Sequence, residues 1–79
     1  MKVKIKLFAT LARYLPPNAE NRTAELDVEE GTTTGQILDQ LEIPAALAHL
    51  TMINGHQEDH EYVLREDDLL TVFPQVAGG

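Results

Sequence analysis

The chain has 79 residues, enough for one small domain and too few for a separate catalytic domain, so a self-contained enzyme is not expected. Hydrophobic residues make up 43% of it, which supports one modest core. The absence of cysteine excludes disulfides, cysteine-ligated zinc and a thiol nucleophile. The net charge of -7 has the wrong sign for phosphate backbones or anionic lipids, so neither nucleic acid nor a membrane is an expected partner.

The charges are segregated along the chain. Residues 1–19 carry four basic side chains and no acid, residues 20–68 carry all thirteen acids, and residues 69–79 carry no charged side chain. The basic start does not resemble a secretory signal, because its lysines alternate with apolar residues and no long apolar run follows. We therefore expect a cytoplasmic protein.

The first half of the chain predicts two strands separated by a short helix. Residues 2–8 alternate lysine with apolar residues, which is typical of a strand with one face buried and one solvated. Helix-forming residues follow at 9–15, and Pro16 ends them. A second alternating run at 23–28 predicts the second strand.

The clearest helix start is at Thr33. With Gln36 three residues later it fits a capping box, and Pro44 is expected to end the helix. The apolar stripe of this helix consists of Ile37, Leu38 and Leu41. It is the only predicted helix that is long enough to cover a sheet.

The second half predicts three more strands. The Asn-Gly pair at 54–55 is a strong hairpin signal between short strands at 51–53 and 56–58. A turn is expected at 64–68, and the near-continuous apolar run at 69–73 is typical of a central strand buried on both faces.

These elements predict an α+β roll, in which one mixed sheet of about five strands carries one main helix, with a short helix after the first strand. In such a roll the first and last strands lie side by side at the centre. The charge-free end of the chain would then lie near Phe8 and Arg13.

The last two residues, Gly78 and Gly79, suggest a chemical role. Without Cβ atoms, and preceded by the small Ala77, they can thread a channel too narrow for larger side chains and present a terminal carboxylate to a partner enzyme. A carboxylate is a poor electrophile until a partner converts it to an acyl-adenylate with ATP. The domain would then be a carrier, with its chemistry supplied by other proteins.

The residues before the glycines are candidates for partner binding. Pro74 lacks an amide donor and should end sheet pairing, which makes 74–79 a flexible tail and leaves Val76 as part of an exposed apolar patch. Phe73 fits either a core position or the partner surface. Arg13 is a candidate for pairing with an acidic patch on the partner. No metal site is expected, since His56 and His60 straddle a turn with no cysteine or third histidine nearby.

Five segments together resemble the MoaD/ThiS family of ubiquitin-like sulfur carriers, and the match covers nearly the whole chain. They are KLFATLARYLP, EGTTTGQIL, MINGH, LREDD and VFPQVAGG. The ending FPQVAGG is similar to the FPPVAGG that is typical of molybdopterin synthase small subunits. The early Phe-Ala-x-Leu favours the same branch.

The resemblance implies a β-grasp fold formed by residues 1–79 as one domain. It implies that a ubiquitin-activating-like adenylyltransferase adenylates Gly79 with ATP and that the residue is then thiocarboxylated. It also implies that the tail enters the large subunit of molybdopterin synthase and donates sulfur to a pterin precursor. The chain itself would bind no cofactor and supply no catalytic side chain. Asp67 stands where many relatives have glycine in a turn, which aspartate tolerates better than most residues.

Two alternative hypotheses about function assume the same fold. In the first, the activated Gly79 serves thiamine, cysteine or transfer-RNA thiolation, as in ThiS-like carriers, or forms isopeptide bonds, as ubiquitin-related modifiers do. In the second, the chain is a non-covalent β-grasp interaction module and its glycines are incidental.

Overall fold

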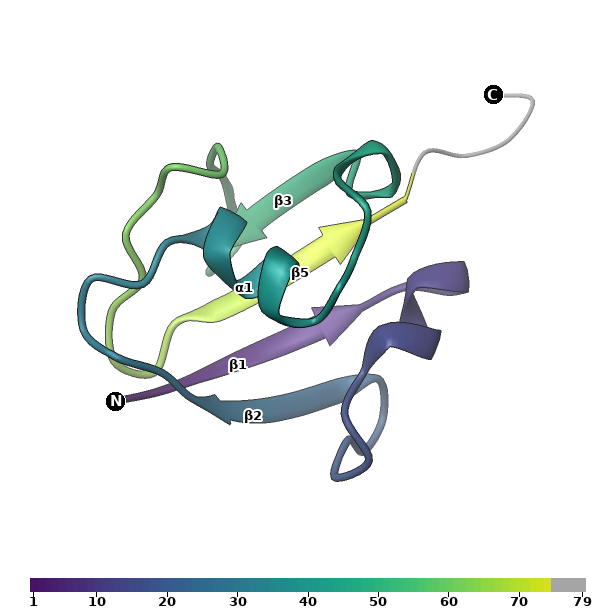
Figure 1. The fold of residues 1–79 in the computed structure, drawn as a ribbon, viewed down its shortest axis with the longest axis horizontal. Helices are drawn as coiled ribbons and strands as arrows, with labels where there is room; N and C mark the ends of the chain where they lie inside the picture. The colour runs from purple at the N-terminus through teal and green to yellow at the C-terminus, as the bar shows by residue number, and fades with distance from the viewer. Residues whose placement is uncertain (75–79) are drawn as a thin grey trace.

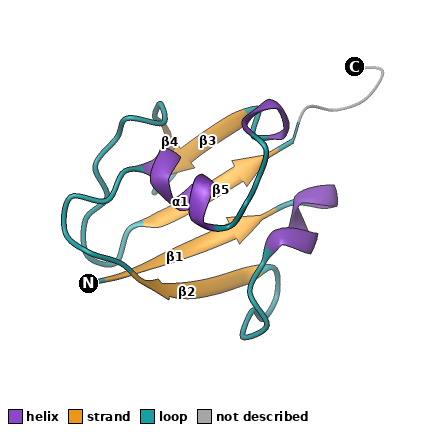
Figure 2. Cartoon of the chain, viewed as in Figure 1, coloured by secondary structure: helices purple, strands orange, loops and turns teal. Residues whose placement is uncertain are grey.

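The computed structural model describes residues 1–74, and within them a five-stranded sheet carries an α-helix across one face (Figure 1). The strands are β1 (Lys2–Leu7), β2 (Thr23–Asp27), β3 (Leu50–Ile53), β4 (His56–Gln57) and β5 (Leu69–Phe73), and the helices are α1 (Thr34–Gln40) and the 3-10 helices η1 (Ala9–Tyr14) and η2 (Ala45–Leu47). The strand order is β2-β1-β5-β3-β4, with β1 and β5 parallel and the other neighbours antiparallel (Figure 2). The predicted α+β roll is confirmed, including the pairing of the first and last strands.

The core lies between α1 and the face of the sheet that α1 covers. Alternate residues of each strand reach it, because successive side chains of a strand point to opposite faces. Its members are Val3, Ile5, Leu7, Leu11, Ala24, Ile37, Leu38, Ile43, Ala48, Ile53, Leu64, Leu70 and Val72. The lysines of β1 face the other side, as predicted: Lys2 and Lys4 are exposed and Lys6 is half-buried.

β5 lies at the centre of the sheet between β1 and β3, as its apolar composition predicts. The prediction that it is buried on both faces is wrong. Leu70 and Val72 are buried, whereas Leu69, Thr71 and Phe73 are only half-buried. The physical reason is that α1 covers one face, while no second layer from residues 1–74 covers the other (Figure 1).

α1 begins where the capping box predicts. The Thr33 hydroxyl accepts from the Gln36 amide at 3.2 Å, and the Gln36 side chain accepts from the Thr33 amide at 2.9 Å. The same first turn docks closely on the loop beyond β4, because the Gly35 amide donates to the His60 carbonyl at 2.8 Å. A Cβ on Gly35 would lie 3.2 Å from that oxygen, so glycine permits the approach.

α1 ends at Gln40, before the predicted end at Pro44. Glu42 adopts a left-handed φ of 60°, which turns the chain out of the helix. The Ile43 amide then donates to the Leu38 carbonyl at 2.9 Å, in the pattern of a Schellman motif. The helix is therefore closed by a left-handed residue, and Pro44 only follows it.

The other short elements form where the sequence predicts them, but one of them differs in type. The predicted helix at 9–15 is a 3-10 helix; it begins at Ala9 with a φ of 52° and buries Leu11. Asn54 and Gly55, at φ of 51° and 88°, form the predicted hairpin turn. No helix within residues 1–74 is long and apolar enough to cross a membrane.

Candidate functional site

The face of the sheet that α1 leaves uncovered carries half-buried apolar side chains from β3, from β5 and from the residue after β1. We call this set the open-face patch: Phe8, Leu50, Met52, Leu69 and Phe73. The pairing register places Leu50 beside Phe73 across β3 and β5. The patch is therefore densest at the end of the sheet where β5 ends.

Phe8 and Phe73 form the centre of this end. Their rings stack with centroids 4.7 Å apart and planes 6° from parallel. The Lys6 ammonium lies 5.2 Å from the centroid of the Phe8 ring, a distance at which the cation is attracted to the ring face. The site therefore combines a flat aromatic surface with a neighbouring positive charge, which suits an apolar partner surface that also carries an acid.

The predicted partner-binding residues that the structure describes lie at the same end of the sheet. Pro74 is half-buried and directly follows β5, which ends at Phe73, as predicted from its missing amide donor. Arg13 is exposed on η1, with its guanidinium carbon 5.7 Å from the Tyr14 ring centroid. η1 follows β1 directly and contacts β5, so Arg13 belongs to this end of the molecule (Figure 1).

The remaining predicted site residues are Val76, Ala77, Gly78 and Gly79, and they lie outside the described residues. Sequence reasoning named Phe73 but missed Leu50 and Met52 as its neighbours on the patch. The period of two in the first strand contained the signal for Phe8, since it places Phe8 on the face of Lys6. The partners from β3 required the strand order.

A network of polar groups holds the other end of β5. The Asp68 carboxylate accepts from the Asn54 side chain and the Arg65 amide, each at 2.8 Å, and from the Tyr62 hydroxyl at 3.3 Å. The Asn54 side-chain oxygen accepts from the Leu69 amide at 2.9 Å. Burial and the neighbouring Asp68 charge raise the pKa of the Tyr62 phenol above its usual 10.0. The network therefore holds the start of β5 against the hairpin between β3 and β4.

The three histidines do not form a common site. His49 and His56 are exposed, and His60 is half-buried beside α1. Within residues 1–74, no group of three or more His, Asp or Glu side chains is placed to hold a metal ion.

Known proteins share this architecture. Residues 1–78 match the family model described as Mut7-C ubiquitin. No curated protein matches the chain. Among solved structures, the small archaeal modifier protein 1 of Haloferax volcanii is 26% identical in sequence and superposes with a TM-score of 0.71, over 95% of this chain and 98% of that one.

Two further structures share the fold at lower identity. Urm1 from Trypanosoma brucei is 16% identical, with a TM-score of 0.69 over 99% of this chain and 95% of its own. A chain from the protein-protein complex of subunits 1 and 2 of molybdopterin-converting factor of Helicobacter pylori 26695 is 15% identical, with a TM-score of 0.61 over 100% of both chains. These matches confirm the β-grasp fold that the sequence resemblance implies. The chain belongs to the Mut7-C ubiquitin family, whose fold is the MoaD/ThiS-like ubiquitin fold.

Proposed function

We propose that the chain is a sulfur carrier that acts in a form ending at Gly79. A carboxylate oxygen of Gly79 attacks the α-phosphorus of ATP on a partner adenylyltransferase, and pyrophosphate leaves. Hydrosulfide, or its equivalent from a sulfur donor, then attacks the acyl-adenylate carbon, and AMP and a proton leave. The product is a thiocarboxylate, whose sulfur a second partner passes to an acceptor.

One observation carries this proposal: the family match extends to Gly78, and Gly79 follows it directly in the Ala77-Gly78-Gly79 run. The described structure supports it further. β5 is the central strand, so the segment beyond Phe73 follows the most firmly held part of the sheet. A glycine pair after a rigid strand suits delivery of a carboxylate into a narrow active site.

The acceptor that we propose is a pterin precursor of molybdopterin, on the large subunit of a molybdopterin synthase. The sequence ending FPQVAGG supports this branch, and the fold similarity to a chain from a complex of subunits 1 and 2 of molybdopterin-converting factor is consistent with it. In this proposal Phe73, Pro74, Val76 and Arg13 contact the partner. The open-face patch extends that contact across the sheet.

The activation step can be tested by ATP–pyrophosphate exchange with candidate adenylyltransferases. We expect exchange that depends on the chain, and we expect its loss when Gly79 is deleted or Gly78 is replaced by valine. Thermal unfolding should be unchanged in both variants, because the core formed within residues 1–74 extends only from Val3 to Val72. Exchange that persists without Gly79 would contradict the proposal.

The partner-binding role of the patch has its own test. Phe8→Ala should weaken binding of the large subunit at least tenfold, because central aromatic side chains dominate most interfaces. Leu47→Ala is the matched control, since Leu47 is also an exposed apolar side chain, at 42% exposure, but lies on η2 outside the patch. Equal effects of the two substitutions would exclude the patch as the interface.

The second candidate function is protein modification. It is favoured by the 26% identity to small archaeal modifier protein 1 over nearly all of both chains. In this case the acyl-adenylate carbon is attacked by a lysine amine of another protein, with AMP and a proton as leaving groups, and an isopeptide bond forms. Mass spectrometry of protease digests from cells that express the chain would show target lysines carrying its C-terminal residues. Their absence under conditions that give a thiocarboxylate would favour the carrier alone.

A further inference from the structure

β2 forms one edge of the sheet, so one side of its backbone faces away from β1 (Figure 2). In an antiparallel pair, the residues that exchange both backbone hydrogen bonds alternate along each strand. Met1 and Val28 exchange both, at 2.9 and 2.8 Å, and the register then places the next such pair at Leu26. The backbone N–H and C=O groups of Glu25 and Asp27 therefore point outward from the sheet.

The beginning of this edge is closed by the chain itself. The Thr23 amide donates to the Glu20 carbonyl at 2.9 Å, and the Glu20 amide donates back at 2.8 Å. The open stretch is thus centred on Glu25 and Asp27, which offer two donors and two acceptors. Because these groups lie two residues apart along the strand, they can pair with one short extended segment of a partner.

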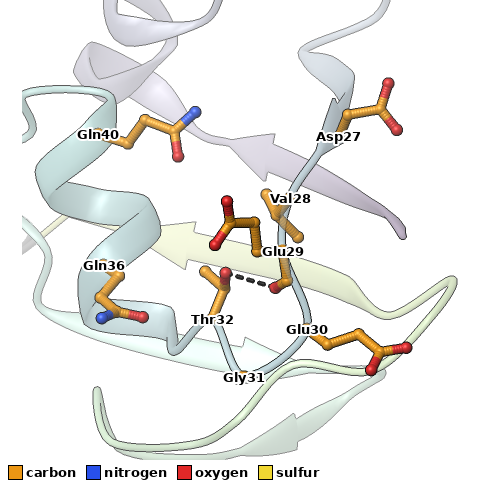
Figure 3. Close-up of a pocket in the computed structure, with 8 residues that line it drawn as sticks. All are labelled: Asp27, Val28, Glu29, Glu30, Gly31, Thr32, Gln36 and Gln40. Atoms are coloured by element: carbon orange, nitrogen blue, oxygen red, sulfur yellow. Dashed lines mark hydrogen bonds between the residues drawn. The ribbon is translucent and has the colours of Figure 1, made fainter.

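Hollows lie at both ends of the open stretch. A cavity of about 470 Å³ separates the end of β2 from α1, and Figure 3 shows Val28 and Glu29 on one side of it with Gln36 and Gln40 on the other. A second cavity, of about 340 Å³, is lined by Glu25 and by the loop before β2. An added segment would therefore find room for side chains at each end.

The pairing of β2 with β1 shows which side chains can lie opposite those of β2. It places Lys4 opposite Glu25 and Lys2 opposite Asp27 on the open face, with Val3 opposite Leu26 on the helix face. Opposite charges in facing positions stabilise a strand pair. The Lys2 ammonium lies 3.5 Å from the Glu25 carboxylate, and both side chains are at least half exposed, so one of the two edge acids is already partly compensated.

We propose that the outer edge of β2 binds an extended basic segment of a partner protein as a sixth strand, by β-strand addition. The segment reads basic–apolar–basic. Its two basic side chains face Glu25 and Asp27 on the open face, and the apolar side chain between them lies beside half-buried Leu26 on the helix face. Glu29 and Glu30 add negative charge at the end of β2 and favour a further basic residue there.

The same features disfavour a second copy of this chain at the edge. Antiparallel pairing of β2 with another β2 would bring Glu25 and Asp27 of one copy against the same acids of the other, and facing like charges are destabilising. The opposite edge of the sheet, β4, spans only two residues and offers a shorter template. The charge of β2 thus selects a basic partner over self-association.

The test uses the acetylated and amidated peptide Thr-Lys-Val-Arg-Val-Lys-Thr with the full chain, followed by calorimetry and by amide NMR shifts. We expect one-to-one binding with shifts concentrated between Ala24 and Glu29. The double variant Glu25→Gln/Asp27→Asn should bind about tenfold more weakly. The matched control Glu58→Gln/Glu61→Gln removes the same charge from exposed residues away from β2 and should bind as the unmodified chain does.

Two further peptides separate strand addition from simple charge attraction. A peptide with N-methyl groups on the amides that would face β2 keeps its charge but cannot donate to the edge, and it should lose binding. A peptide with glutamate in place of its basic residues should also fail to bind. Equal binding of the methylated peptide, equal loss in the control variant, or no binding of the original peptide would each overturn the proposal. Thermal unfolding of both variants verifies that they are folded.

Discussion

Asp68 connects the turn before β5 to the hairpin between β3 and β4. Among the thirteen acidic residues, all of which the structure describes, it is the only one that is buried. Its carboxylate accepts hydrogen bonds from Asn54, Tyr62 and Arg65. A buried carboxylate is stable only when such donors compensate its lost hydration, so the three donors explain why this acid can be buried.

Removing the carboxylate should destabilise the fold. Asp68→Ala leaves the Arg65 amide and the Asn54 side chain without their acceptor, and hydrogen bonds to a charged group are each worth about 1.5 to 3 kcal/mol. Because Asn54 and Arg65 are exposed, water replaces part of this bonding, and we expect the free energy of unfolding to fall by about 2 kcal/mol in urea titration. Asp39→Ala, at an exposed position of α1, is the control and should change it by less than about 0.5 kcal/mol. Equal effects would show that the network is not structural.

Tyr62 makes the stability of the same network depend on pH. Because its pKa is raised above 10.0, the folded chain holds the phenol proton more tightly than the unfolded chain does. The resulting stabilisation is fully present below about pH 10 and is lost as the pH rises through the raised pKa. Tyr62→Phe should therefore flatten the decline of the unfolding free energy that begins near pH 10. Tyr14→Phe, on η1, should leave the decline in place; the reverse pattern would contradict this assignment.

The stacked pair Phe8 and Phe73 lies on the open face, so its contribution to folding should be limited. Phe73→Ala should lower the free energy of unfolding by about 1 to 3 kcal/mol, below the roughly 3 to 5 kcal/mol that is typical of a fully buried phenylalanine. A double-mutant cycle with Phe8→Ala should give a coupling of about 0.5 to 1.5 kcal/mol, as expected for a stacked pair. A loss near 5 kcal/mol would mean that Phe73 is a core residue and not a surface anchor.

The helix α1 illustrates how an element is limited at both ends by local geometry. Its start could be predicted, because the capping box is a pattern of residue types at a fixed spacing. Its end could not, because a left-handed residue other than glycine leaves no sequence signal. Glu42 adopts that conformation, at φ 60°, because the Schellman bonds and the burial of Ile43 favour it.

This geometry makes a stabilising substitution possible. Glu42→Gly removes the steric cost of the left-handed conformation, which is about 1 kcal/mol for a side chain with a Cβ, and should raise the melting temperature. Asp39→Gly, inside α1, should lower it slightly, because glycine is less favourable than aspartate in a helix by about 0.3 kcal/mol. A lower melting temperature for Glu42→Gly would show that its side chain contributes more than its backbone costs.

The strands were the most predictable elements, because a period of two distinguishes their faces. β5 is the exception. Its five residues are apolar apart from Thr71, so composition gave no sign that only Leu70 and Val72 would be buried. The burial of the other face depends on whether a second layer exists. That is a property of the whole chain and of its partners, and residues 69–73 do not encode it alone.

At the scale of the whole molecule, the two faces of the sheet have different roles. α1 and the core account for stability, while the open face carries the three lysines of β1 and the open-face patch. The sequence predicted Phe73 and Pro74 at this end of the sheet from the order of the strands. It could not predict the contribution of Leu50 and Met52, which meet the patch only through the pairing of β3 with β5.

The proposed function requires Gly79 to carry sulfur. The most direct test is the intact mass of the chain after incubation with ATP, a partner adenylyltransferase and a sulfur donor. We predict the mass change for exchange of one oxygen for sulfur, localised by fragmentation to Gly79, and no change in the chain that lacks Gly79. An unchanged mass under conditions that support ATP–pyrophosphate exchange, or sulfur found on any other residue, would contradict a sulfur-carrier function of Gly79.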